Sequence, residues 1–348
     1  MEISQVLKFA VEKGASDVLL TVGSPPMVRI NGELTPTNAP VLTPEATKKL
    51  VYSILEESQV AAFEAKKELD FSLQVKDIHR FRGNVYLQRG CVSAAFRLIP
   101  NRIPNLKELG LPPLLDDLAL RHQGLILVTG PTGHGKSTTQ AAMVDLINQK
   151  RKVHIVTVED PIEFVHTNKK SVIDQREVGE DTHTFADALS HVLRQDPNVI
   201  LIGEMRDPDT IAAAVTAAET GHLVISTLHT NDAVQAIDRM LDVFPPHQQG
   251  QIRTQLALCL LAILAQRLLP RADGKGRVAA TELLINNTGV ANLIREEKTH
   301  NLYTILETHA KDGMYTMDSS IKQLYLKGVI TYEEARLRMR DPSALKTA

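Results

Sequence analysis

The chain has 348 residues, of which 43% are hydrophobic and 23% charged, a composition that excludes a disordered or fibrous protein. This length predicts about two domains, each large enough to bury its own core. The formal net charge of −2 provides no basic excess for nucleic-acid binding, and Trp is absent. Two cysteines, Cys91 and Cys259, cannot build a disulfide framework or a four-thiolate zinc site, so we expect both to be buried hydrophobic residues.

Nothing in the sequence predicts a membrane span. The longest apolar run, Leu256–Ala265, stops at Gln266 and is much shorter than the roughly 20 apolar residues that a transmembrane helix needs. The N-terminus mixes charged residues into an apolar stripe and has no secretory signal. The sequence therefore predicts a cytosolic protein.

Residues 1–98 are expected to form a small α+β domain. Apolar residues recur at helical spacing over Glu2–Lys13, and Asn31-Gly32 is a dipeptide favoured in tight hairpins. Alternation of apolar and polar residues predicts a half-buried strand over Leu69–Val75. Two more strands are expected at Phe81–Gln88 and Ala94–Leu98. Prolines interrupt residues 99–113, so this stretch is interpreted as a linker.

Residues 114–348 alternate short apolar strands with helices, the pattern of a parallel sheet covered on both faces. Strands are expected at Leu125–Thr129, Val153–Val158, Val199–Gly203 and Leu223–Thr227. Helices are expected to begin near Ser137, Thr184 and Asp209. From Asp232 onward helices are expected to dominate, including Gln248–Leu268 and Ser319–Lys327.

Residues 130–137, GPTGHGKS, fit the pattern G-x-x-x-x-G-K-[ST] of a phosphate-binding loop between a strand and a helix. Glycines let backbone N–H groups surround phosphate oxygens, and the helix N-terminus adds positive potential. We expect Lys136 to reach the β- and γ-phosphates and the Ser137 hydroxyl to hold Mg²⁺. The residues expected to bind the nucleotide are Gly130, Pro131, Thr132, Gly133, His134, Gly135, Lys136, Ser137 and Thr138.

Carboxylates follow two predicted strands at the edge where open parallel sheets bind their ligands. Glu204 ends the strand at Val199–Gly203 and resembles a Walker B carboxylate, although Gly-Glu stands where many P-loop enzymes have Asp. The strand at residues 153–158 is followed by Glu159, Asp160 and Glu163. A P-loop enzyme needs a carboxylate that orients Mg²⁺ and a base for the attacking water, and Glu204 and Glu163 are the candidates, whereas Glu159 and Asp160 fit caps or solvated loop acids better.

His222 and His229 bracket the strand expected at Leu223–Thr227 and do not have the spacing of metal ligands on a helix. Composition alone favours a structural role for each. Their place beside a strand of the nucleotide sheet leaves open a contact to the γ-phosphate or to a subunit interface.

Several long motifs, in this order, resemble the PilT-type retraction ATPases of bacterial type IV pili, within the secretion ATPase superfamily. GPTGHGKSTT resembles that family's Walker A motif and VTVEDPIEF its Asp box. LRQDPNVILIGEMRD resembles its Walker B motif and TAAETGHLVISTLHTN its His box. The segments RFRGNVYLQRG and NLIREEKT extend the resemblance over nearly the whole chain.

The resemblance implies a PAS-like N-terminal domain and a RecA-like P-loop NTPase domain with a helical C-terminal region. It implies an enzyme that hydrolyses ATP with Mg²⁺ as a homohexamer and drives pilus retraction and twitching motility. The implied partners are a platform protein of the inner membrane and a paralogous retraction ATPase, with no nucleic acid. The implied location is the cytoplasmic face of the inner membrane, with indirect membrane association.

The resemblance also assigns roles to single residues. Glu163 would polarise the attacking water, and Glu204 would act with Ser137 on the Mg²⁺ shell. The two histidines would couple the nucleotide state to the neighbouring subunit, so His222 joins the nucleotide-binding set. The residues that the resemblance makes catalytic are Glu163, Glu204, Lys136, His229, Arg82 and Arg97, the two arginines reaching the nucleotide from an adjacent domain or protomer.

The chain departs from the family pattern at two positions. His134 stands where the family usually has Ser, and because that position mainly offers backbone atoms, nucleotide binding is expected to survive. Ala291 stands in place of an Arg in the family's retraction-associated AIRNLIRE motif. Two alternatives stay open: a pilus-extension or type II secretion ATPase, which usually carries a four-cysteine zinc module, and an accessory nucleotide-binding retraction subunit.

Overall fold

The computed structural model describes residues 2–30, 32–75, 79–99 and 102–345 of the chain. The chain divides into two compact units between Arg102 and Ile103, inside the stretch interpreted as a linker. The last strand of the first unit ends at Leu98, and the first helix of the second begins at Leu114. Each unit has a hydrophobic core of its own.

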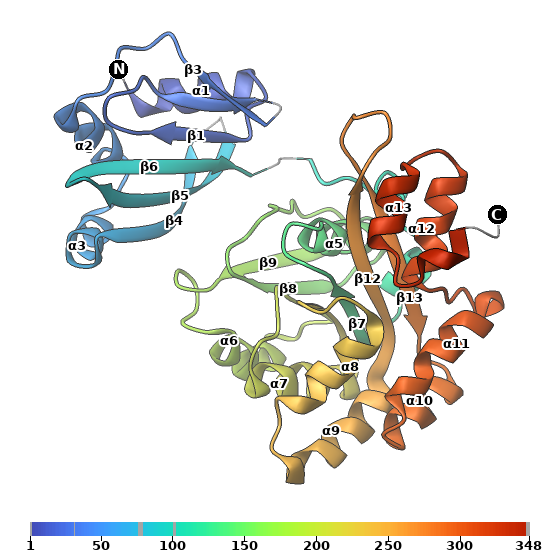
Figure 1. Cartoon of the computed structure of the whole chain (residues 1–348). Coiled ribbons are helices and arrows are strands. Elements are labelled where there is room, and N and C mark those ends of the chain that lie inside the picture. The colour runs from blue at the N-terminus through green and yellow to red at the C-terminus, as the bar shows by residue number, and fades with distance from the viewer. Residues whose placement is uncertain (1, 31, 76–78, 100–101, 346–348) are drawn as a thin grey trace. The chain divides into compact units, whose positions relative to one another are not determined.

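The first unit is built on an antiparallel sheet of six strands in the order β3-β2-β1-β6-β5-β4 (Figure 1). Three helices are described in it: α1 (Ile3–Glu12), α2 (Pro44–Tyr52) and α3 (Glu57–Lys66). The strands are β1 (Asp17–Leu20), β2 (Met27–Ile30), β3 (Glu33–Pro36), β4 (Glu68–Val75), β5 (His79–Gln88) and β6 (Cys91–Leu98).

The sequence patterns explain these elements. The helix expected at Glu2–Lys13 is α1, whose apolar face is buried in the core of the unit. Strands β2 and β3 pair as the expected hairpin, while Asn31 lies outside the described residues. The strand expected over Leu69–Val75 is β4, and the next two expected strands are β5 and β6. The expected burial of the cysteines holds for Cys259 but not for Cys91, which is only partly covered.

The second unit contains a sheet of seven strands in the order β13-β12-β7-β11-β10-β8-β9. All neighbours pair in parallel except β12 and β13. The four expected strands are confirmed as β7 (Gly124–Thr129), β8 (His154–Glu159), β10 (Val199–Ile202) and β11 (Leu223–Leu228). They read as apolar runs because parallel strands in the middle of a sheet are buried on both faces.

Helices cover both faces of this sheet, as expected for a mixed α/β fold. Along β7, Ile126 and Val128 pack against α4 (Leu114–Ala119) and α5 (Lys136–Lys150) on one face. Leu125 and Leu127 point into the opposite core. That core is formed with α6 (Phe185–Val192), α7 (Pro208–Glu219), α8 (Ala233–Asp242), α9 (Pro246–Cys259), α10 (Thr288–Arg295) and α11 (Leu302–Thr308).

The expected helix at Gln248–Leu268 is wrong in its second half. Helix α9 ends at Cys259, and β12 (Leu260–Pro270) continues the chain as a strand between β7 and β13 (Arg277–Ile285). Hydrophobic periodicity cannot tell a buried helix from a buried strand in a short continuous apolar run, and this strand is buried on both faces. Strand β13 and the edge strand β9 (Val172–Glu177) were also not predicted from the sequence.

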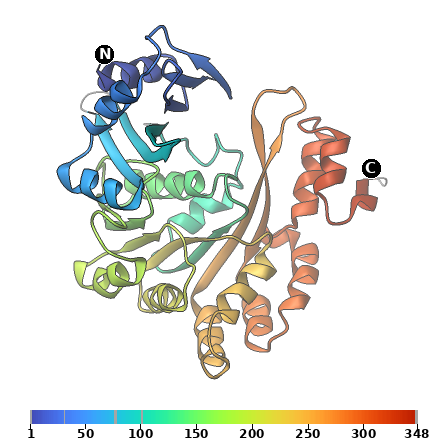
Figure 2. The same ribbon diagram turned by 60° about the vertical axis from the view of Figure 1, so that its left-hand side comes forward.

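The C-terminal helices α12 (Met317–Leu326) and α13 (Tyr332–Arg338) pack on the β12–β13 hairpin, as Figure 2 shows. The helix expected at Ser319–Lys327 is α12. Their small core includes Ala265, Leu269 and Ala280 from the hairpin. Among the described residues, no helix combines the length and the apolar character that crossing a membrane requires.

Candidate active site

The phosphate-binding loop joins the carboxyl end of β7 to the first turn of α5. Gly130, Gly133 and Gly135 adopt φ angles of 144°, 77° and 83°, which residues with a Cβ rarely adopt. A Cβ on Gly130 would lie 2.2 Å from the backbone oxygen of Gln266 in β12. The first glycine of the motif is therefore required by close packing of the loop against β12 as well as by its conformation.

Lys136 is the first residue of α5, and its side chain folds back over the loop. Its Nζ donates to the carbonyl oxygens of Gly130 at 2.8 Å and Pro131 at 3.1 Å. Burial lowers the pKa of this ammonium group, while the carboxylates of Glu204 and Glu163 act in the opposite direction. Both carboxylates singled out in the sequence thus lie close enough to act on the charge of Lys136.

Glu204 stands just beyond the carboxyl end of β10 and connects two neighbouring residues. Its Oε1 pairs with Nη2 of Arg206 at 2.7 Å, and its Oε2 lies 2.9 Å from Nε2 of His229. Nδ1 of His229 lies 3.4 Å from the Thr132 hydroxyl in the phosphate-binding loop. A polar chain therefore runs from the ends of β10 and β11 to the loop, and His229 is its middle link.

Glu163 lies exposed in the loop between β8 and β9, beyond the cis peptide between Asp160 and Pro161. Glu159, the last residue of β8, anchors this loop. Its carboxylate accepts hydrogen bonds from the Thr157 hydroxyl at 2.7 Å, from Nε2 of Gln175 at 3.1 Å and from the backbone N–H of Glu163.

Burial raises the pKa of Glu159 to about 7. The expectation that Glu159 is a cap or a solvated acid is therefore wrong, because the loop that it anchors folds over its carboxyl group. Asp160 is exposed, as expected. The anchored loop carries Glu163 within electrostatic reach of Lys136.

His222 is not brought to this group. It precedes β11, and its backbone oxygen accepts from the N–H of Gly124 at the start of β7. The phosphate-binding loop follows the opposite end of β7, roughly 16 Å away at 3.3 Å per residue. Nδ1 of His222 lies 2.9 Å from the carbonyl oxygen of Ala217, at the end of α7. His222 therefore lies away from this group within its own chain, since flanking a strand does not place two residues at the same end, and its contact with a nucleotide stays a prediction.

Arg82 and Arg97 belong to the first unit, where they stand opposite each other in the register of β5 and β6. Both are exposed, and Nε of Arg97 pairs with Oδ1 of Asp17 at 2.9 Å. Their contact with a nucleotide stays a prediction.

The side chains near the phosphate-binding loop suit a Mg²⁺ ion that is held mainly by phosphates and water. Within the described part of the chain, no three His, Cys, Asp or Glu side chains are grouped as metal ligands. Mg²⁺ in nucleotide sites is usually held by one or two protein oxygens together with phosphates and water, so the hydroxyl of Ser137 and the carboxylate of Glu204 fit it. Glu204 keeps acceptor capacity beyond its contacts to Arg206 and His229.

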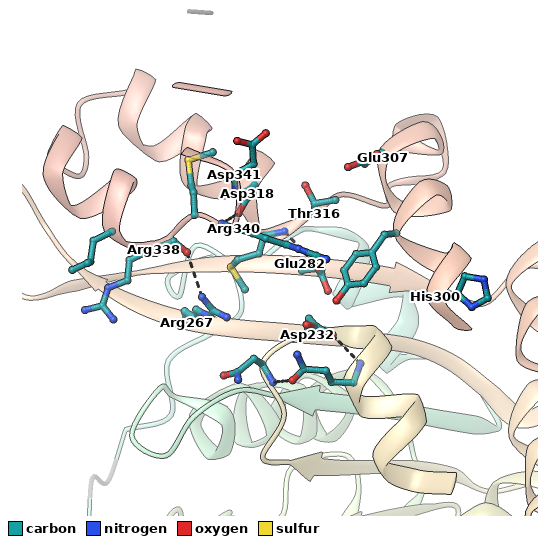
Figure 3. A pocket seen from close by; sticks show the side chains of 16 residues that line it. Asp232, Arg267, Glu282, His300, Glu307, Thr316, Asp318, Arg338, Arg340 and Asp341 are labelled. Atoms are coloured by element: carbon teal, nitrogen blue, oxygen red, sulfur yellow. Dashed lines mark hydrogen bonds between the residues drawn. The ribbon is translucent and has the colours of Figure 1, made fainter. Parts of the chain in front are cut away.

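A separate cavity of about 1110 Å³ lies between the hairpin, α8 and the C-terminal helices (Figure 3). Much of its charge is satisfied internally. Asp318 accepts the backbone N–H groups of Arg340 and Asp341, and Glu282 accepts those of Ala233 and Met317. No residue of the phosphate-binding loop lines it, so we assign it no part in nucleotide binding.

Comparison with known proteins identifies the family of the chain. The family described as "Type II/IV secretion system protein" matches residues 2–337. A protein of Pseudomonas aeruginosa named as the type IV pilus retraction ATPase PilT is 44% identical over 342 residues, which cover 98% of this chain and 99% of that protein. The type IV pilus ATPase PilU of the same organism is 43% identical over 335 residues, covering 96% of this chain and 88% of PilU.

Solved structures agree. A crystal structure of the pilus retraction motor PilT with bound ADP has a TM-score of 0.94 and 50% identity, with 100% of both chains covered. The ATPase DotB of Legionella pneumophila has a TM-score of 0.84 and 26% identity, with 96% of this chain and 94% of DotB covered. Because the family match and the relatives extend over nearly the full length, the chain belongs to the type II/IV secretion system protein family.

Proposed function

We propose that this chain is an ATP-hydrolysing motor that drives type IV pilus retraction. The observation that carries the proposal is the polar chain Thr132–His229–Glu204 beside Lys136. The chain that carries these residues is similar over nearly its whole length to a protein named as a pilus retraction ATPase. The same groups are the ones that phosphoryl transfer to water requires.

Binding of ATP follows from the loop. Its backbone N–H groups surround the β- and γ-phosphates, and Nζ of Lys136 exchanges the carbonyl oxygens of Gly130 and Pro131 for phosphate oxygens. The Ser137 hydroxyl and the Glu204 carboxylate would hold Mg²⁺, which would supply neutralisation of the phosphate charge. Thr132 and His229 close the site on the side of β11.

Hydrolysis then needs a positioned water. Glu163 accepts a proton from this water as its oxygen attacks the γ-phosphorus, while the bond from that phosphorus to the β–γ bridging oxygen breaks. ADP and inorganic phosphate leave. Glu159 and Gln175 hold the loop on which Glu163 lies, so the base does not depend on a free segment for its position.

The further elements of the proposal rest on family membership. The first unit is PAS-like and the second RecA-like, and six copies form a ring in which Arg82 and Arg97 reach nucleotide across an interface. The motor acts at the cytoplasmic face of the inner membrane through a platform protein. PilU, which is nearly as similar as PilT, supports a second candidate, an accessory retraction ATPase that works beside a paralogue.

ATPase activity of the purified chain tests the enzymatic part. Glu163→Gln keeps the shape of the side chain but cannot accept the proton, so we expect kcat to fall about 10²- to 10⁴-fold with MgATP binding retained. Glu180→Gln, an exposed loop residue, is the matched control and should leave kcat unchanged. Rates for wild type and Glu163→Gln that are both at the background level would reject the enzyme proposal, whereas equal rates above background would reject only the role of Glu163 as the base.

Deletion of the gene tests the direction of the motor. Cells with many pili but no surface motility, rescued by wild type and not by Lys136→Ala, are the result expected for retraction. Bald cells would instead show extension. Rescue that succeeds only when a paralogous ATPase is also present would favour the accessory role. Ala291, which replaces an Arg of the retraction-associated motif, is the residue that raises this alternative.

A further inference from the structure

The phosphate-binding loop has a back as well as a front. Lys136, Glu204 and His229 lie toward the position of the nucleotide, whereas the β12–β13 hairpin touches the loop from behind. In the register of β12 and β7, Ala265 is the partner of Thr129, so Gln266 stands level with the first residue of the loop. The side chain of Gln266 is only 3% exposed.

Three hydrogen bonds connect the hairpin to consecutive residues of the loop. Nε2 of Gln266 donates to the carbonyl oxygen of His134 at 2.9 Å, and Nη1 of Arg277 donates to that of Gly133 at 3.1 Å. The backbone N–H of Leu268 donates to Nδ1 of His134 at 2.9 Å. Oε1 of Gln266 accepts from the hydroxyl of Thr139 at 2.8 Å, which fixes the orientation of the amide.

These bonds set the direction of two peptide planes. In a trans peptide, the carbonyl of one residue and the N–H of the next point in opposite directions. Because the carbonyl of His134 is directed at Gln266, the N–H of Gly135 points away from the hairpin. The bond from Arg277 turns the N–H of His134 in the same way. Both N–H groups are thereby turned to the side on which phosphate oxygens bind.

We propose that Gln266 and Arg277 are positioning residues that hold the phosphate-binding loop in its nucleotide-binding form from the β12–β13 hairpin. The inference rests on the proposed binding of ATP. Neither residue needs to touch the nucleotide, because each acts through a carbonyl oxygen of the loop. Gly135 shows how tight the support is, since a Cβ there would lie 2.8 Å from Nε2 of Gln266.

The test uses the full-length chain and two substitutions of different burial. Gln266→Glu keeps an oxygen for the Thr139 hydroxyl but replaces the donor to His134 by a carboxylate oxygen, which repels that carbonyl. Arg277→Gln removes the donor to Gly133 from an exposed side chain and leaves the core untouched. Arg271→Gln is the matched control, because Arg271 lies in the same hairpin and pairs with Asp273 rather than with the loop.

The readout is the division between KM and kcat for MgATP, with the melting temperature of the nucleotide-free protein measured alongside. The loop N–H groups bind ground state and transition state alike, so we expect KM to rise about tenfold in each variant and kcat to change less than about twofold. The melting temperature of Arg277→Gln and all values of Arg271→Gln should match wild type.

Unchanged KM in both variants would overturn the proposal, as would a fall in kcat with KM unchanged, which would place the hairpin in the chemical step. If Gln266→Glu does not fold, the exposed Arg277→Gln decides alone. If wild type itself neither binds nor hydrolyses MgATP, it is the proposed function that fails, and the two failures are thereby distinguished.

Discussion

The two sides of the phosphate-binding loop work by different means. The front carries charge: an ammonium group, two carboxylates and an imidazole gather from the ends of β8, β10 and β11 and from the start of α5. At the back, the β12–β13 hairpin contacts the loop through hydrogen bonds to its backbone and to His134, and these bonds bear on the conformation of the loop. The residues proposed to perform the chemistry and the residues proposed to set its geometry therefore come from separate parts of the chain.

The largest effect is expected at the front of the loop. Lys136→Met keeps the apolar stem but removes the charge that faces the phosphates, so kcat/KM should fall about 10³-fold or more. The nucleotide-free protein should be at least as stable as wild type, because burial disfavours the lysine charge. Steady-state ATPase kinetics check the first expectation. Thermal melting with and without MgATP checks the second, and the shift caused by nucleotide should vanish.

Lys150→Met, at the exposed end of the same helix, is the control and should behave as wild type. A nucleotide-induced shift that survives in Lys136→Met would mean that the front does not bind phosphate through this residue.

The front of the phosphate-binding loop could be predicted from the sequence, whereas the hairpin at its back could not. The loop, Lys136 and Glu204 were predicted because their chemistry depends on local spacing next to recognisable apolar strands. The hairpin was missed because Leu260–Ala265 is buried on both faces and shows no period, and because its partners in the loop lie more than 120 residues away in the sequence. One signal was present: Gln266 is a polar residue at the end of a buried apolar run.

The surroundings of His222 and Glu159 could not be predicted, for related reasons. Both ends of β11 carry a histidine, and only the direction of the strand decides that His229 lies beside the phosphate-binding loop. Glu159 was expected to be a cap or a solvated loop acid, but the loop that continues from it returns over the carboxyl group and bonds to it. Local sequence does not encode such a return path.

A pair of glycine substitutions separates the two sides of the loop. Gly133→Ala and Gly135→Ala both place a Cβ at positive φ, 77° and 83°, which costs about 1–2 kcal/mol. Only at Gly135 does the Cβ also meet the hairpin, 2.8 Å from Nε2 of Gln266, whereas at Gly133 nothing lies within 4 Å. We expect KM for MgATP to rise about tenfold more in Gly135→Ala than in Gly133→Ala. Equal KM values in the two variants would show that contact with the hairpin does not set the conformation of the loop.

Glu159 allows the anchor of the Glu163 loop to be tested through pH. Its pKa is raised in the folded protein, so between its ordinary value of 4.5 and about 7 the unfolded chain is ionised and the folded one is not. The stability that the protonated Glu159 side chain contributes to the folded protein is fully present below the ordinary pKa of 4.5 and is lost as the pH rises through about 7. Melting temperatures at pH 5 and pH 8 should therefore differ less in Glu159→Gln than in wild type. An identical pH dependence would mean that Glu159 does not titrate in this range.

The smallest effect is expected at His134, where the family usually has Ser and where the hairpin meets a side chain of the loop. Nδ1 can accept the N–H of Leu268 only while its lone pair is free. Burial lowers the pKa of His134, with Arg277, Arg338, Lys136 and Arg267 acting in the same direction. The imidazole is thus neutral in the folded protein at neutral pH. The stability that the neutral imidazole contributes is lost as the pH falls below the ordinary pKa of 6.5 toward the lowered pKa of His134. The melting temperature should then fall more between pH 7.5 and pH 5.5 in wild type than in His134→Ser. His191→Ser, at the exposed end of α6, should keep the wild-type pH profile. A profile that His134→Ser leaves unchanged would place the acid sensitivity at the charged front of the loop.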